Sequence, residues 1–367
     1  MRIAHLALTF LVAAGCSGSP TDDSLAFTDP ADDEKADRPG ASLSPTGPFA
    51  VTGAYPIVLH HGFNASPDSD WGWHPRVKQV LESLGHQVFI SQVNPYATPE
   101  ARAAELRDFV LDVLTQTGAP QVHIIAHSQG GLDARLLVHP AGYNLAVLVR
   151  SITTISTPHR GTFVADTAGP FLDTLAPPDG STPAELPKLS PALDWLTGIL
   201  AKQLNAKAST YVFDLRGALH SMAEKTIDAE FNDRIFDLPG FYYQSYAGVS
   251  NVGSLVNPAD VAACEIDATE EGAAGTLSRL RNGTRDTMTG ALVPVAGIVA
   301  HGLRLLPNDG VVRVDSARWG RFRGCLLTDH MGEVGQGNHA GAKDPRTGFD
   351  IYVFYAGVAA ELVREHQ

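Results

Sequence analysis

The chain has 367 residues, 44% of them hydrophobic and 18% charged, and a chain of this length and composition can bury a large core. Its formal net charge of -13, with no run of Lys and Arg, argues against a nucleic-acid partner, because phosphate binding needs a basic face. A neutral or dispersed substrate is compatible with this charge.

Residues 1–16 are typical of a lipoprotein-type signal peptide. Arg2 precedes an apolar stretch at 6–14, and small residues precede Cys16. The apolar stretch is too short to span a membrane, so it indicates export. Because AAGC at 13–16 resembles a bacterial lipobox, we expect a cell-envelope protein whose peripheral membrane association depends on lipidated Cys16. The alternative is an ordinary signal peptide with an incidental cysteine, which gives a secreted protein.

Residues 17–48 predict a flexible acidic linker, because they are rich in Asp, Pro, Ser and Gly and hold almost no large apolar residue. The folded domain is therefore expected at 49–367. No later stretch is expected to cross a membrane. The apolar run at 291–307 is short and contains His301 and Arg304, so it predicts a core helix.

Two cysteines, Cys264 and Cys325, remain if Cys16 is the anchored residue. An even pair in an exported protein favours a disulfide, because the compartment is oxidising. The alternative is two reduced, buried thiols.

Apolar runs bounded by turn signals alternate with helical patterns in the folded part. Thr98 is expected to cap a long helix that Gly118 ends. The alternation predicts an α/β fold with a doubly wound, mostly parallel sheet. Strands are expected at 55–62, 86–93, 121–128 and 150–157, and helices at 74–85, 98–118 and 130–140.

The junction IIAHSQGGLDARLL places Ser128 at a sharp turn between a strand and a helix. The motif is Ala126-x-Ser128-x-Gly130, with Ala at the position where Gly is usual. Small residues matter because a nucleophile elbow holds its serine in a strained conformation and packs tightly against its neighbours. Ser128 is therefore the candidate nucleophile.

The loop LHHGFNAS follows the first strand and supplies an HG-containing segment. Its backbone and the start of the helix after the nucleophile are expected to donate N–H groups to an oxyanion. The expected donors are the backbone N–H groups of Phe63 and Gln129. The imidazoles of His60 and His61 are interpreted as strand-end groups bonded to nearby backbone.

A serine nucleophile needs a base and a carboxylate, and α/β-hydrolases supply the acid before the histidine. Asp309 stands in an Asn-Asp-Gly turn before a short apolar segment, and Asp315 is its nearby competitor. The segment TDHMGEVGQGNH offers two candidate bases, His330 and His339.

These residues together resemble the true lipases of bacterial family I, the Pseudomonas and Burkholderia type. The similarity runs through YPIVLHHGF, AHSQGGLDAR, STPHRGT, GALHSMAEKTIDAEFN, NDGVV and DHMGEVGQ, in the family's order, and covers most of residues 50–367. The resemblance implies an α/β-hydrolase fold and a triacylglycerol lipase or carboxylesterase whose chemistry needs no cofactor. It also implies a triad of Ser128, Asp309 and His330, because the family's histidine follows its aspartate at a similar distance.

The resemblance also implies a structural calcium. The family has an aspartate ligand two positions after the histidine, where this chain has Gly332. The other carboxylate ligand corresponds best to Asp260. One ligand is therefore missing unless Glu333 or Asp329 substitutes for it.

The family's cysteine after the Asn-Asp-Gly turn is replaced by Asp315, so a bond between Cys264 and Cys325 would be a relocated brace for the loop of His330. The resemblance leaves open a folding chaperone as a partner, as in some family members. It gives no nucleic-acid partner.

A Pro-rich insertion at about 161–215 interrupts the alternation and contains an apolar helix pattern at 190–204. In lipases a helix of this region is a lid, which opens where its apolar face meets a lipid surface. The alternative is a helix that is permanently part of the core. His159, on the loop that leads to the insertion, is expected to be structural.

The resulting expectation is a lipolytic serine hydrolase that acts on an ester or lipid at an interface. One alternative is an extracellular polyester depolymerase of the polyhydroxyalkanoate type, which needs the same triad and an open cleft. A second is a non-catalytic binding protein on an inactive hydrolase fold.

Overall fold

A computed structural model describes residues 55–66, 69, 71–175, 214–266 and 276–366. The expected signal peptide, the expected lipobox cysteine, the expected linker and the apolar helix pattern of the insertion lie outside the described residues.

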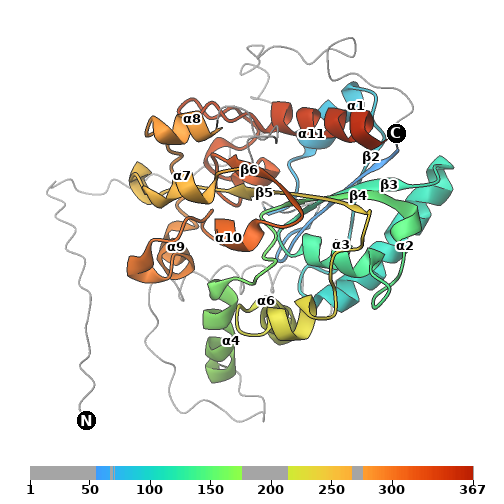
Figure 1. Cartoon of the computed structure of the whole chain (residues 1–367), viewed down its shortest axis with the longest axis horizontal. Helices are drawn as coiled ribbons and strands as arrows, with labels where there is room; N and C mark the ends of the chain where they lie inside the picture. The colour runs from blue at the N-terminus through green and yellow to red at the C-terminus, as the bar shows by residue number, and fades with distance from the viewer. Residues whose placement is uncertain (1–54, 67–68, 70, 176–213, 267–275, 367) are drawn as a thin grey trace, which may run out of the picture. The chain divides into compact units, whose positions relative to one another are not determined.

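A six-stranded parallel sheet forms the centre of the described domain (Figure 1). Its strands lie in the order β2-β1-β3-β4-β5-β6. The first strand, β1, therefore lies inside the sheet, β2 forms one edge, and β3 to β6 follow one another to the other edge. Parallel neighbours need a crossover, and the helices provide it. The strands are β1 (Ile57–His60), β2 (Val88–Ile90), β3 (Val122–His127), β4 (Val149–Ile155), β5 (Tyr242–Gly248) and β6 (Arg321–Leu326).

Helices cover both faces of this sheet (Figure 1). On one face α1 (Pro75–Ser83) and α11 (Ile351–His366) share an apolar cluster with Ile57 and Leu59 of β1. On the other face α2 (Pro99–Thr117) and α3 (Gly130–Val138) share a cluster with Val58. Successive strand residues point to opposite faces, so a buried apolar run is required on both sides. The expected doubly wound α/β-hydrolase sheet is confirmed.

The expected helix ends of α2 are also confirmed. The Thr98 hydroxyl accepts a hydrogen bond from the Ala101 N–H at 3.4 Å, which caps the first turn. Gly118 ends the helix in the left-handed conformation at φ 67°.

The remaining described helices surround the carboxyl ends of the strands or the far edge of the sheet. Ala165 and Ala168 from one of them pack with Leu219 and Met222 from another in a third apolar cluster. These helices are α4 (Phe163–Leu175), α6 (Leu215–Met222), α7 (Ala259–Ala263), α8 (Thr276–Arg281), α9 (Val293–Val299) and α10 (Val314–Ala317).

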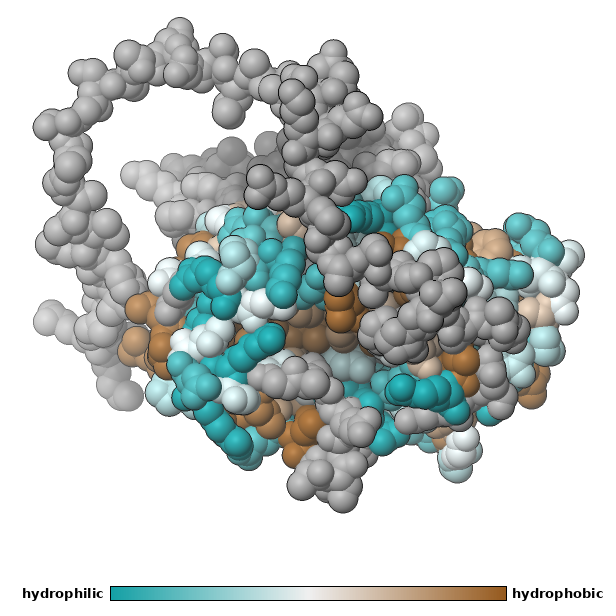
Figure 2. Space-filling view, turned by 90° about the horizontal axis from the view of Figure 1, so that it is seen from above, coloured by the Kyte–Doolittle hydropathy of each residue, from teal (hydrophilic) through white to brown (hydrophobic). Residues whose placement is uncertain are grey.

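The run at 291–307 differs from the expected core helix. Only its first part is α-helical, as α9, and a short 3-10 turn at Gly302–Arg304 follows between His301 and Leu305, whose φ angles of 53° and 47° are left-handed and prevent a continuous helix. Leu303 is 85% exposed. Figure 2 shows brown, hydrophobic patches set among teal, hydrophilic residues on one face.

Cys264 and Cys325 form the expected disulfide, with their Cα atoms 5.3 Å apart. It joins the end of α7 to β6, the strand that leads to the loop of His330. No helix among the described residues combines the length and the apolar character that crossing a membrane requires.

Candidate active site

Ser128 stands between the last residue of β3 and the first of α3, at the carboxyl edge of the sheet. Its φ of 56° is in the left-handed region, which an L-residue adopts only when its surroundings hold it there. The backbone N–H of Ser128 donates to the Ile155 carbonyl at 2.9 Å. A Cβ on Gly130 would lie 2.8 Å from the His61 carbonyl oxygen, so the small residue is required by close packing. The turn therefore has the geometry expected of a nucleophile elbow.

Asp309 and His330 lie together on two loops at the same edge. The His330 Nδ1 and an Asp309 carboxylate oxygen are 2.7 Å apart. The other carboxylate oxygen accepts the backbone N–H groups of Val311 and Val312 at 2.8 and 2.7 Å. Asp309 is fully buried, and its bond fixes a proton on Nδ1, which leaves Nε2 as the basic nitrogen.

The competing acid and base lie elsewhere. The side chain of Asp315 is 61% exposed and pairs with Arg313. His339 is one-third exposed and lies 3.6 Å from Asp344. Neither Asp315 nor His339 lines the cavity that holds Ser128.

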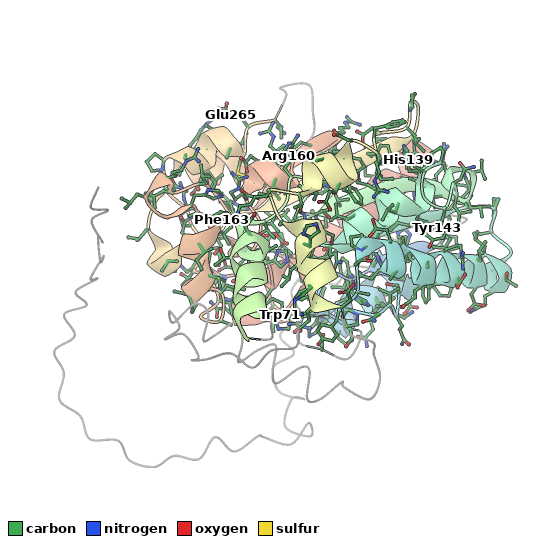
Figure 3. All side chains as sticks on the ribbon, turned by 90° about the horizontal axis from the view of Figure 1, so that it is seen from below. Trp71, His139, Tyr143, Arg160, Phe163 and Glu265 are labelled. Atoms are coloured by element: carbon green, nitrogen blue, oxygen red, sulfur yellow. A yellow bond between two sulfur atoms is a disulfide. The ribbon has the colours of Figure 1, made fainter. Side chains whose placement is uncertain are left out.

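Ser128 and His330 line one apolar cavity of about 90 Å³. Its walls come from the loop after β1, from α4 and α6, and from α9, and Figure 3 shows Phe163 at the start of α4. An apolar cavity beside a serine and a histidine suits an acyl chain or another apolar group. The other lining residues are Phe63, Asn64, Trp71, His127, Pro158, Thr162, Val164, Ala165, Leu219, Met222, Val295, Val311 and Val312.

Phe63 and Gln129, the expected oxyanion donors, come from the two segments that flank the nucleophile. Phe63 lines the cavity, and its ring meets Tyr96 edge-on at 6.1 Å between centroids. Gln129 caps the start of α3, and its side-chain amide donates to the Ala97 carbonyl at 2.9 Å. The side chain of Gln129 is thus held away from the cavity while its backbone stays next to Ser128.

Glu333 is a member of the site whose role the sequence did not reveal. It is fully buried, accepts a hydrogen bond from the Ser156 hydroxyl at 2.6 Å, and lies 3.0 Å from His127 Nε2. A Cβ on Gly248 would lie 1.9 Å from a Glu333 oxygen, so only glycine leaves room for the carboxyl. These two partners lie 177 and 206 residues away from Glu333 in the chain, so no local sequence pattern indicates the contacts.

Burial is the main cause that raises the pKa of Glu333 well above its usual value, and the charge of Asp309 adds to it. Burial also lowers the pKa of His127, with a further contribution from His330. The second ring nitrogen of His127 bonds the backbone of His330, so it carries the proton. The raised pKa favours a neutral Glu333, and its contact with His127 Nε2 joins the loop of His330 to the strand before Ser128.

The two histidines after β1 differ in their contacts. His61 bonds the neighbouring Gly62 carbonyl at 3.1 Å, as expected. His60 instead bonds the side chains of Ser91 and Asp133, at 2.7 and 2.8 Å. Burial lowers the pKa of His60, so it stays neutral in this network.

The residues that the sequence suggested for calcium have other hydrogen-bond partners. An Asp260 oxygen accepts the Arg285 Nε–H at 2.8 Å, so a guanidinium occupies the place of a cation. Asp329 accepts three backbone N–H groups, from Thr289, Met331 and Gly332. Such a fully bonded carboxylate steadies the loop of His330 through hydrogen bonds.

The described part of the chain contains two groups of three residues that could bind a metal ion. Within each group, the potential ligand atoms all lie within 4.8 Å of one another. One is His127 with His330 and Glu333, which belongs to the site above. The other is Asp286 with His339 and Asp344, beside the same loop.

Comparison with known proteins agrees with this fold. Residues 55–176 match the sequence family described as the alpha/beta hydrolase fold. A triacylglycerol lipase of Vibrio cholerae is 29% identical over 219 residues, covering 57% of this chain and 67% of that protein. A triacylglycerol lipase of Burkholderia plantarii is 37% identical over 134 residues, covering 34% of this chain and 35% of that protein.

The structure is also similar to that of a metagenomic carboxyl esterase. The TM-score is 0.54 at 15% sequence identity, and the match covers 90% of this chain and 82% of that one. At this identity the likeness concerns the fold.

Proposed function

We propose that this chain is a lipase of the α/β-hydrolase superfamily and that it hydrolyses carboxylic esters, as a triacylglycerol lipase or carboxylesterase, through Ser128, His330 and Asp309. The part of the chain that matches the alpha/beta hydrolase family, residues 55–176, contains Ser128, and relatives named triacylglycerol lipase align with this chain over 219 and 134 residues. The apolar walls beside Ser128 and the chain's net charge of -13 favour a neutral ester over an anionic one.

In the proposed reaction His330 Nε2 removes the proton of the Ser128 hydroxyl, and the serine oxygen bonds to the ester carbonyl carbon. The negative charge on the carbonyl oxygen is held by the backbone N–H groups of Phe63 and Gln129. Asp309 stabilises the imidazolium that forms. His330 then protonates the leaving alcohol, and the acyl group remains on Ser128.

A water molecule completes the cycle by the same proton transfers. His330 takes its proton, the hydroxide oxygen attacks the acyl carbon, and Ser128 leaves with the proton returned from His330. The ester and water are the only reactants, and Ser128 and His330 carry the acyl group and the protons between them. Lipases of this fold need no cofactor for the chemistry.

The observation that carries the proposal is the pairing of a serine in a left-handed turn with a histidine already oriented by a buried aspartate. The two side chains line one apolar cavity. Burying an aspartate costs free energy unless other groups compensate for it. Here two backbone N–H groups bond one carboxylate oxygen, and the other oxygen is placed to stabilise a charge on His330. That arrangement favours catalysis over an inactive fold.

The test is hydrolysis of p-nitrophenyl butyrate by purified Ser128→Ala. We expect a loss of about 10⁵-fold or more in kcat, in line with removal of other serine nucleophiles. Ser151→Ala is the matched control, because Ser151 is buried on β4 and bonds His123 at 2.7 Å without lining the cavity. Full activity in Ser128→Ala would refute the assignment. Comparing triolein emulsion with polyester film then separates a lipase from a depolymerase.

We also propose that the protein is exported by residues 1–16 and anchored through lipidated Cys16, with 17–48 as its tether. Metabolic labelling with a palmitate analogue tests this. Label on the wild-type protein and none on Cys16→Ser supports the anchor, whereas equal labelling of both refutes it.

A further inference from the structure

The two expected oxyanion donors belong to different segments, so their separation depends on what joins those segments. Phe63 lies on the loop after β1, whereas Gln129 begins α3 after β3. A donor contributes fully only when it lies within hydrogen-bond reach of the oxyanion. A backbone donor cannot be removed by substitution. Its contribution can be tested by replacing the side chains that hold it in position.

Arg102 of α2 forms hydrogen bonds with both segments. Its Nη2 donates to the His61 carbonyl at 2.5 Å, two residues before Phe63. Its Nε donates to a carboxylate oxygen of Asp133 at 2.8 Å, in the first turn of the helix that Gln129 caps.

The remaining nitrogen of the Arg102 guanidinium bonds the segment at residues 94–95, which also contacts the loop after β1. This nitrogen, Nη1, donates to the Asn94 carbonyl at 2.8 Å. The Asn64 N–H donates to the neighbouring Pro95 carbonyl at 3.0 Å, so the same segment also holds the residue after Phe63.

Asp133 completes the connection. Arg102 and Asp133 are both fully buried, and the carboxylate oxygen that accepts from Arg102 also lies 2.8 Å from His60 Nε2. Burial raises the pKa of Asp133, and the adjacent guanidinium opposes that rise. Buried charges persist when they are paired and bonded, and such a network fixes its elements in one arrangement.

Both Arg102 and Asp133 are buried outside the residues that line the cavity. We propose that Arg102 is a positioning residue for ester hydrolysis, whose guanidinium links the His61 carbonyl to Asp133 and so fixes the spacing of the Phe63 and Gln129 N–H groups. This inference rests on the proposed function. It predicts a loss in the chemical step without a loss in substrate affinity.

The test compares Arg102→Lys and Arg102→Met with Arg285→Met. Arg285 is a matched control, because it is equally buried, donates through Nε to Asp260 at 2.8 Å, and also bonds backbone carbonyls. Its partners do not belong to the oxyanion segments. Folding is checked by circular dichroism, and the concentration of active enzyme by titration with a fluorophosphonate.

We expect Arg102→Met to lower kcat for p-nitrophenyl butyrate by about 100-fold with KM changed by less than about 3-fold, because misplaced donors lose transition-state stabilisation alone. Butylboronic acid, which forms a tetrahedral adduct on the serine, should bind more weakly by a similar factor. Arg102→Lys should be intermediate, since an ammonium keeps the charge beside Asp133 but lacks the planar fork that reaches three acceptors. Arg285→Met should keep kcat.

Arg102→Met leaves Asp133 without its partner, which can prevent folding. The double variant Arg102→Met with Asp133→Leu removes both charges, and its kcat then decides. A kcat within about 3-fold of wild type in a folded Arg102 variant overturns the proposal, as does an equal loss in Arg285→Met. Inactive wild-type protein, or a fully active Ser128→Ala, would instead refute the proposed function.

Discussion

The buried carboxyl of Glu333 gives a prediction whose size follows from its contacts. Replacement by Ala leaves the Ser156 hydroxyl proton without an acceptor and His127 Nε2 without a partner, while the Ser156 oxygen still accepts the Gly248 N–H. At about 1–3 kcal/mol for each unsatisfied group, the free energy of unfolding should fall by about 2–6 kcal/mol. Replacement by Gln has a different outcome, because the amide has the same shape, donates to His127 and accepts from Ser156. We expect Glu333→Gln to change stability by no more than about 1 kcal/mol.

The pH dependence of these variants tests the protonation of Glu333. Its pKa in the folded protein lies above that of the unfolded chain, so the native state binds the proton more tightly. The stability that the carboxyl contributes is therefore complete below the unfolded pKa of about 4.5 and declines as the pH rises toward the folded pKa. The amide of Glu333→Gln does not titrate, so this variant should become more stable relative to wild type as the pH rises.

Urea denaturation of wild type, Glu333→Gln and Glu333→Ala at a series of pH values from 4 upward supplies the measurement. Glu333→Leu is a useful comparison, because it fills the volume without hydrogen bonding. If Gln destabilises as much as Ala, or if the difference between wild type and Gln is independent of pH, the carboxyl is ionised in the folded protein and the reasoning fails.

Three further predictions concern the acid, the base and the brace of the site. Asp309→Asn should lower kcat by about 10³- to 10⁴-fold with little change in KM, because the imidazole loses its orientation and its counter-charge; steady-state kinetics with an unchanged kcat would exclude this aspartate. His330→Ala should abolish ester hydrolysis whereas His339→Ala keeps it within about 3-fold, and the reverse result in the same assay would exchange their roles. Replacing Cys264 and Cys325 by Ser opens a 61-residue loop. This should lower the free energy of unfolding by about 4 kcal/mol in urea denaturation, and a loss under about 1 kcal/mol would show that the disulfide adds little.

The elements that the sequence predicted well are those defined by local chemistry. Thr98, Gly118 and the apolar runs of β1 and β3 depend on neighbours in the chain, and the structure has them at nearly the expected positions. The elbow at Ser128 is likewise local, since a strand, a tight turn and a glycine next to the helix suffice to define it. The helix expected over 291–307 was wrong in its second half, because left-handed backbone at His301 could not be read from composition.

The contacts that hold the site are non-local, and composition does not encode them. Arg102 and Asp133 are 31 residues apart, and Glu333 meets His127 from 206 residues away. Each was visible only as a charged residue in an apolar surrounding, a pattern shared with many surface positions. Asp260 was chosen for calcium from its place after a strand, whereas the structure pairs it with Arg285. The pairing requires the fold, so only the fold could reveal it.

The central claim is that Ser128 is a nucleophile activated by His330. Its most direct measurement is mass spectrometry of the purified protein after reaction with an alkyl fluorophosphonate, with the modified peptide sequenced. We expect one adduct, on Ser128, which is absent in Ser128→Ala and forms much more slowly in His330→Ala. A wild-type protein that stays unmodified, or an adduct on another residue, would contradict this claim.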